Sequence, residues 1–238
     1  MSGVQALSGV QAPSVFAGSA NVIAVGVLLA EFGMFRQALL RDQIRLYAAQ
    51  SALISVLAVV VAAARHLPDL YVLAALSAGL KVVLVPALLR RLLGITRPSA
   101  AAGHGRTDIA GSGSLSLAST VLLAIIVAAF GFFSAGALAI RSPVLPMTAL
   151  AISLSVTLVA FVLMIMRRDV ASQAIGFFSL ENGISLTALV VAAGLPLILE
   201  LAFLFDLLVA VVVFGLLIRL HHSKSDSLST TDLTSLRG

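Results

Sequence analysis

The chain has 238 residues, of which 60% are hydrophobic and only 11% charged, with a formal net charge of +5 and a mean hydropathy of +1.13. Soluble domains carry about a quarter charged residues, so the composition excludes an ordinary soluble protein and predicts an all-α, polytopic helix bundle in a membrane. The basic residues stand singly or in pairs at the ends of apolar blocks, which argues against nucleic-acid binding. With no cysteine, the chain has no disulfides, thiolate metal sites or iron–sulfur clusters.

Seven apolar stretches are long enough to cross the core of a bilayer, which takes about 20 helical residues. A three-helix block is predicted over 1–93 and a four-helix block over 117–220. Between them, 94–116 is rich in Gly, Ser and Ala and predicts a flexible cytoplasmic loop. The last segment, 221–238, predicts a polar cytoplasmic tail, either solvated or docked on a neighbouring subunit. The predicted spans are about 15–35, 47–64, 70–89, 117–140, 146–166, 171–193 and 196–218.

Lys and Arg set the expected orientation, because cytoplasmic loops are enriched in these residues. Alternating the loops across seven spans places twelve cations on one side and only two, Arg65 and Arg141, on the other. The N-terminus is therefore predicted outside and the C-terminus in the cytoplasm. The twelve cytoplasmic cations are Arg36, Arg41, Arg45, Arg90, Arg91, Arg97, Arg106, Arg167, Arg168, Arg219, Lys224 and Arg237.

Few ionisable residues remain inside the predicted spans, where a charge at the centre of a lone helix costs at least ~2.5–3.5 kcal/mol. Lys81, Glu181 and Asp206 lie near the midplane, each about ten or eleven residues from a membrane face. Glu31 lies near the cytoplasmic end of the first span and is expected to be an interfacial acid. Glu200 lies near the outer end of the last span, where it either caps the entrance to a water path or is interfacial.

The sixth span has a polar side. Ser179, Glu181, Asn182 and Ser185 fall within an arc of about 160° on a helix of 3.6 residues per turn. Such a face must meet protein or water, because lipid cannot satisfy it.

Lys81 has a polar neighbour in Ser77, one turn earlier on the third span. A buried pair of Lys81 with Glu181 or Asp206 would fix helix packing and add little net stability. A proton relay is the other interpretation, because desolvation disfavours the charged forms of both amine and acid. The two interpretations are compatible, since a switchable pair can gate a relay.

No histidine lies at membrane depth, so the spans offer no axial ligand for b-type haem. No catalytic triad, paired-carboxylate site or metal-ligand cluster can be argued from the spacings. The sequence therefore predicts a chain without a catalytic site, cofactor or metal of its own.

Several patches give the chain a family resemblance. They are LKVVLVPALL (80–89), RRDVASQAIGFFSLENG (167–183), LPLILELAFLFDLLVAVVVF (195–214) and LTSLRG (233–238), with AAQSALIS (48–55) as a weaker match. In these patches the chain resembles component E of the hydrogenase-4 and formate hydrogenlyase membrane arm, a relative of respiratory complex I.

The last three spans, from 146 on, are similar to the K subunit of bacterial complex I. Phe178 stands where that subunit has a glutamate, with Glu181 one turn further on. Asp206 lies about one turn before the position of its second acid. Each carboxylate thus keeps roughly its helix face and changes its depth.

The resemblance implies a non-catalytic, multi-pass subunit of an energy-converting NiFe hydrogenase in the bacterial inner membrane. Its partners would be antiporter-like subunits, a quinone-site-like anchor subunit and a peripheral hydrogenase arm that holds every metal. Protons or sodium ions would move along a hydrated axis formed by Glu181, Asp206, Lys81 and Glu200, supported by Asn182, Ser185, Ser179 and Ser77.

Two alternatives remain open at the level of the sequence. The chain is either an inert scaffold whose buried charges lock it to its neighbours, or a stand-alone secondary transporter. The two helical blocks show no convincing internal repeat, which such transporters often have.

Overall fold

A computed structural model describes residues 15–37, 39–94, 117–138, 145–167, 169–192 and 197–226, and these residues are almost entirely helical. Helices α3 and α4 are joined through the π-helical segment η2 into one continuous span, Pro68–Leu92. The elements are α1 (Val15–Arg36), α2 (Leu40–Arg65), α3 (Pro68–Ser77), η2 (Ala78–Leu84), α4 (Val85–Leu92), α5 (Leu117–Leu138), α6 (Met147–Met166), α7 (Val170–Ala192) and α8 (Leu197–Asp226).

In the described part of the chain, six helices are long and apolar enough to cross a membrane, and α8 adds the shorter apolar stretch Phe205–Ile218. The protein is thus a polytopic helical membrane bundle, as its composition predicts. Two boundaries differ from the predicted ones. Helix α2 begins at Leu40, ahead of the predicted position 47, and α8 continues to Asp226, into the predicted polar tail. Helices run past the apolar core into the headgroup region, where Arg41 at the start of α2 can be solvated.

The division into two helical blocks stays a prediction. The loop predicted at 94–116 lies outside the described residues beyond Gly94, and so does the tail from 227 on. Helices from the two predicted blocks pack together in one bundle.

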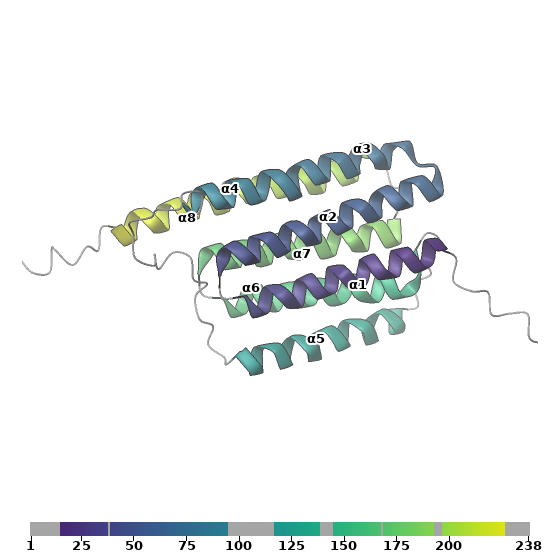
Figure 1. Cartoon of the computed structure of the whole chain (residues 1–238), viewed down its shortest axis with the longest axis horizontal. Coiled ribbons are helices and arrows are strands. Elements are labelled where there is room, and N and C mark those ends of the chain that lie inside the picture. The colour runs from purple at the N-terminus through teal and green to yellow at the C-terminus, as the bar shows by residue number, and fades with distance from the viewer. Residues whose placement is uncertain are drawn as a thin grey trace, which may run out of the picture.

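The helices form two layers with one helix beside them (Figure 1). Helices α1, α2 and the α3–η2–α4 span make one layer. Helix α6 packs behind α1, α7 behind α2, and α8 behind α3 and α4. Helix α5 packs mainly on α6 at the edge of the bundle. This arrangement puts α7 behind the middle helix of the other layer, where its polar side is enclosed.

Successive spans run in opposite directions along the bundle (Figure 1). The ends carrying Arg36, Arg41, Arg90 and Arg167 therefore lie together, and the turn with Arg65 lies at the other end. By the positive-inside rule the first of these ends is predicted to be cytoplasmic, and we call it the cytoplasmic end and the opposite one the outer end.

A cluster of side chain-to-backbone hydrogen bonds ties the cytoplasmic turns together. The Arg167 guanidinium donates to the carbonyls of Phe35 at 2.9 Å and Gln37 at 3.1 Å. Gln43 donates to the same Gln37 carbonyl at 2.8 Å. Partial burial lowers the pKa of Arg167, and the nearby Asp169 carboxylate opposes that shift. The guanidinium stays charged at neutral pH, so it can hold the α1–α2 turn against the α6–α7 turn.

Glycines allow α6 to approach its neighbours closely. A Cβ atom at Gly131 of α5 would lie 2.8 Å from the Cα of Ser155, and one at Gly176 of α7 would lie 3.0 Å from the Cα of Met164. At Gly183 a Cβ atom would lie 2.8 Å from the backbone nitrogen of Thr157. Small residues at helix contacts are typical of membrane bundles, where close backbone packing replaces hydrophobic burial.

Buried apolar side chains form two separate clusters along the bundle. One lies towards the cytoplasmic end and includes Met34, Tyr47 and Phe178. The other lies towards the outer end and includes Val27, Ile54 and Leu186. On α1, α2 and α7 several buried polar residues fall between members of the two clusters, and Lys81 of η2 and the half-buried Ser185 lie beside them. We call this set the polar layer: Glu31, Gln50, Ser51, Lys81, Ser179, Glu181, Asn182 and Ser185.

Candidate functional site

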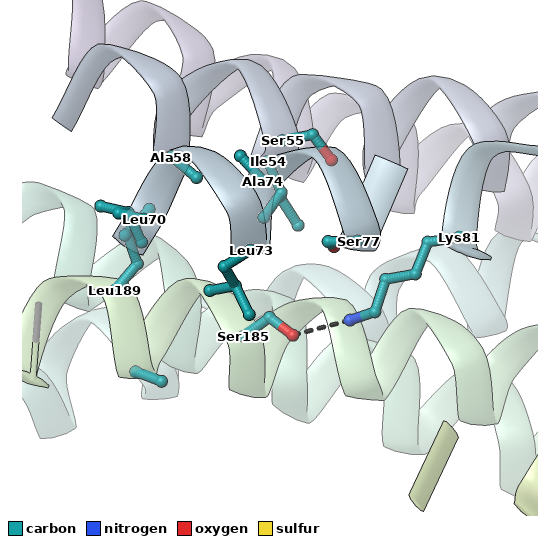
Figure 2. Close-up of a pocket in the computed structure, with 11 residues that line it drawn as sticks. Ile54, Ser55, Ala58, Leu70, Leu73, Ala74, Ser77, Lys81, Ser185 and Leu189 are labelled. Carbon is teal, nitrogen blue, oxygen red and sulfur yellow. Dashed lines mark hydrogen bonds between the residues drawn. The ribbon is translucent and has the colours of Figure 1, made fainter. Parts of the chain in front are cut away.

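Lys81 and Glu181 form an ion pair at the centre of the bundle. The Lys81 Nζ lies 3.5 Å from Glu181 Oε2, and the two side chains are 2% and 8% exposed. The same ammonium donates a hydrogen bond of 2.7 Å to Ser185 Oγ (Figure 2). Of the two acids that the sequence offers to Lys81, the fold brings Glu181 into contact with it.

The π-helical segment positions Lys81. Within η2 the hydrogen bonds span five residues, so the Val85 amide donates to the Leu80 carbonyl. Pro86 follows directly and has no amide hydrogen to donate, which removes one α-helical bond from this turn. Single π turns occur often at functional sites. Here the wider turn carries the lysine that points towards α7.

A cavity leads to this pair from the outer half of the bundle. It lies between α2, α3 and α7, with Leu70, Leu73 and Leu189 towards the outer end and Lys81 and Ser185 at the inner end (Figure 2). Its volume is about 60 Å³, measured as space open to the centre of a water-sized sphere. One water needs ~10–15 Å³ on this measure, so several fit. Ser55 and Ser77 also line the cavity, and the predicted supporting residue Ser77 therefore lies beside the pair.

Glu31 is not at the interface, and the expectation from its sequence position is wrong. Its side chain is fully buried, and its Oε2 accepts a 2.7 Å hydrogen bond from Gln50 Nε2 and another from the Ser179 hydroxyl. Arg36, five residues later, lies about 140° further round the helix and is exposed. Closeness in sequence suggested an interfacial acid, but the direction of the side chain places it in the polar layer.

Asn182 connects α7 with α2. Its Nδ2 donates to Gln50 Oε1 at 2.9 Å and to Ser51 Oγ at 2.8 Å. The Ser179 hydroxyl lies 2.9 Å from the same Gln50 oxygen. A serine has one hydroxyl proton, so Ser179 donates either to Gln50 or to Glu31 at any moment. The polar side predicted for this helix is thus enclosed by three other helices.

Helix α2 contributes a polar stripe that the sequence reading did not identify. Gln43, Tyr47, Gln50, Ser51 and Ser55 are all buried and recur at helical spacing along one face. The spacing is the signal that could have revealed them. These α2 side chains are uncharged at neutral pH, so a count of charged groups inside the spans does not find them. Tyr47 packs on Phe178 with ring centroids 5.9 Å apart.

Asp206 is placed differently from the other midplane charges. Its side chain is exposed on α8, beside the exposed apolar residues Phe205 and Val209. It nevertheless lies within electrostatic range of Glu181. Glu200 lies in the first turn of α8, and its side chain is outside the described part of the structure.

Several buried oxygens in the polar layer lack full hydrogen bonding. Glu31 Oε1 and Asn182 Oδ1 have no partner among the described residues, and Glu181 Oε2 meets only the Lys81 ammonium. A buried polar atom without a partner costs ~1–3 kcal/mol, and bound water normally satisfies such atoms. The arrangement therefore suits a hydrated polar layer with two carboxylates and one amine. Among the described residues no group of three His, Asp or Glu is arranged to hold a metal ion.

Comparison with known proteins finds a distant relative of this chain. The chain is 33% identical over 139 residues to the uncharacterized protein Rv0085 of Mycobacterium tuberculosis. The match covers 58% of this chain and 60% of the relative. No family model matches the sequence, and no solved structure matches it.

Proposed function

We propose that the chain is a proton-translocating membrane subunit, without a catalytic site of its own, in an energy-converting NiFe hydrogenase complex of the hydrogenase-4 type. The observation that carries the proposal is the Lys81–Glu181 pair, buried at the inner end of a cavity large enough for several waters. Paired charges at this depth are costly to insert and mark proton pathways in membrane proteins.

The chemistry of the pair suits proton transfer. Desolvation disfavours both charged forms, while their mutual attraction favours them, so the balance responds to any change around the pair. A proton arriving through the cavity neutralises Glu181 and leaves the Lys81 ammonium on Ser185, to which it already donates at 2.7 Å. Transfer in the other direction restores the pair. The group thus serves as a switch whose two states differ by one proton.

The type of complex rests on the sequence resemblance. The motifs around Lys81, Glu181 and Asp206 resemble component E of hydrogenase-4, which belongs beside antiporter-like and quinone-site-like subunits. The exposure of Asp206 at membrane depth supports a neighbouring subunit, because a carboxylate facing lipid is unfavourable. In this proposal the bundle lies in a bacterial inner membrane, and Asp206 continues the path into the neighbour.

Replacing Glu181 by Gln in the assembled complex tests the proposal. The variant removes the titrating group and keeps nearly the same shape, so electron transfer should persist while proton translocation falls to the level of uncoupled membranes. The measurement is acidification of inverted membrane vesicles per electron transferred. Asp42→Asn is the matched control, since it replaces a carboxylate in an exposed pair with Arg45, with an O–N distance of 3.1 Å.

Other outcomes separate the alternatives. Unchanged coupling in a complex containing Glu181→Gln would contradict the relay. Loss of assembly, with normal translocation by the residual complex, would favour a scaffold in which the pair fixes helix packing. A purified chain that transports a solute without hydrogenase subunits would indicate a secondary transporter.

A further inference from the structure

We propose that Glu31 is a second proton-binding site and that it carries its proton in the resting protein. The inference rests on the proposed function and deepens it, because it adds a carboxylate on α1 to the residues that hold protons. The Lys81–Glu181 pair lies at one edge of the polar face of α7, and Glu31 lies at the other.

The position of Glu31 follows from the geometry of α7. Ser179 and Glu181 are two residues apart and therefore about 160° apart round the helix. Ser179 contacts Glu31 of α1, while Glu181 contacts Lys81 of η2. Asn182 lies between them and binds α2. The two carboxylates thus lie in separate environments, at opposite edges of the polar side of α7.

Glu31 has no cationic partner among the described residues. It is fully buried, and no ion pair involves it. Lys81 is engaged with Glu181 and Ser185. Arg167, the cation that reaches the end of α1, donates to the backbone carbonyls of Phe35 and Gln37.

The helices around Glu31 offer few other groups that titrate. Helices α5 and α6, which pack against α1, contain no ionisable side chain. On α2 the ionisable group at this depth is Tyr47, and on α7 it is Glu181. Neither is a cation, so nothing on the packed helices balances a negative charge on Glu31.

The hydrogen bonds match a neutral carboxyl group. Gln50 Nε2 and the Ser179 hydroxyl both donate to Oε2. In a neutral carboxyl group this oxygen would be the carbonyl oxygen, which accepts hydrogen bonds. Oε1 has neither donor nor acceptor among the described residues, so it is free to carry the proton, and its O–H would need a bound water as acceptor. An unpaired carboxylate at this depth is strongly disfavoured, so the group neutralises by binding a proton.

Ser179 gives this site a connection to the rest of the polar layer. Its hydroxyl donates to Glu31 or turns towards Gln50 Oε1, 2.9 Å away. When Glu31 releases its proton, its carboxylate attracts the Gln50 amide and the Ser179 hydroxyl more strongly. Ser179 then donates to Glu31 and no longer to Gln50 Oε1, which leaves that oxygen to Asn182. Protonation of Glu31 is therefore linked to the hydrogen bonds between α2 and α7.

Infrared spectroscopy of the full chain in lipid nanodiscs tests the inference. At neutral pH the wild type should show the carbonyl stretch of a protonated carboxyl group, and the band should disappear as the pH is raised. Glu31→Gln should lose this band, and Glu181→Gln, the matched control, should keep it. A band unchanged in Glu31→Gln, or lost only in Glu181→Gln, would overturn the assignment.

Two further measurements keep the test decisive. Glu31→Asp retains a carboxyl group on a shorter side chain and should show the band at a shifted frequency, even if the Gln variant folds poorly. Sodium added at constant pH should leave the wild-type band unchanged, and its loss would assign the site to sodium instead. The readout needs no assembled complex, so it can fail or succeed independently of the translocation experiment.

Discussion

Lys81 has two hydrogen-bond acceptors on α7. The effect of replacing any of these residues on the free energy of unfolding depends on which charges remain buried. The Lys81 ammonium contacts the Glu181 carboxylate and the Ser185 hydroxyl; the two charged groups are buried and Ser185 is half-buried. In such pairs the attraction between charges roughly offsets their desolvation. The pair is therefore weak evidence for stability, but either charge is costly when left alone.

Lys81→Met should destabilise the protein by about 3–5 kcal/mol, the usual cost of leaving a buried charge unpaired. The double variant Lys81→Met/Glu181→Gln should regain most of this loss, since it buries no charge. Unfolding by denaturant in detergent micelles gives the free energies for a double-mutant cycle. A double variant as unstable as the single one would show that Glu181 is not the partner that matters.

Whether a residue of the candidate site could be identified from the sequence depended on its chemistry. Glu181, Asn182 and the serines of α7 were identified from periodicity, because one helix face carried all of them. Gln50 was not, since an amide does not appear in a count of charges, and Glu31 was expected at the interface because it lies near Arg36 in the chain. The choice between Glu181 and Asp206 as partner of Lys81 depends on how distant helices pack, which no local pattern records.

At the scale of elements, α7 is the helix on which the site is built. It presents its polar face to α1, α2 and η2, and its glycines face α6. Gly176 and Gly183 are seven residues apart, which places them on the same side of the helix. The last residue of the E-N-G triplet thus has a packing role distinct from those of its two neighbours.

Gly183→Ala should destabilise the bundle by ~1–3 kcal/mol, the usual cost of overpacking a tight contact. The added methyl group would lie 2.8 Å from the Thr157 nitrogen and 2.9 Å from its Cα, so backbone must move. Gly136→Ala on α5 is the control, because no atom lies within 4 Å of a Cβ there. Equal unfolding midpoints for the two variants would contradict the close α6–α7 contact.

The boundaries of elements were predictable where hydropathy decides them. The predicted spans agree with α1, α5, α6 and α7 to within about two residues. The start of α2 was missed because Arg41, Asp42 and Arg45 lower the local hydropathy, although charged residues are compatible with a helix beyond the lipid core. The π turn at Lys81 was not predicted, although Pro86 gave a clue to an irregular helix.

At the scale of the whole molecule, the bundle exposes apolar side chains on its outer helices and encloses polar ones. Phe130 and Phe133 of α5, and Val212 and Leu216 of α8, are among the exposed large residues. A water-soluble protein rarely exposes so much apolar surface, and a bilayer or neighbouring subunits must cover it. Asp206 interrupts this surface on α8.

The orientation in the membrane can be measured directly, because the chain contains no cysteine. Asp69→Cys at the start of α3 should react with a membrane-impermeant maleimide on intact cells. Arg41→Cys at the start of α2 should react only after the membrane is opened. Both side chains are exposed, so access depends on the side of the membrane. Labelling in the reverse order would contradict the orientation derived from the cations.

The cavity beside Lys81 has a consequence for which ions can pass. Apart from serine hydroxyls, its lining side chains supply no oxygen ligands, and an ammonium stands at its inner end. A metal cation entering it would lose its hydration shell without replacement ligands and would then meet a positive charge. A proton needs only a chain of hydrogen-bonded waters and a base, here the Glu181 carboxylate, to receive it. In the proposed function this lining selects against sodium, because a sodium ion would find too few oxygen ligands in the cavity.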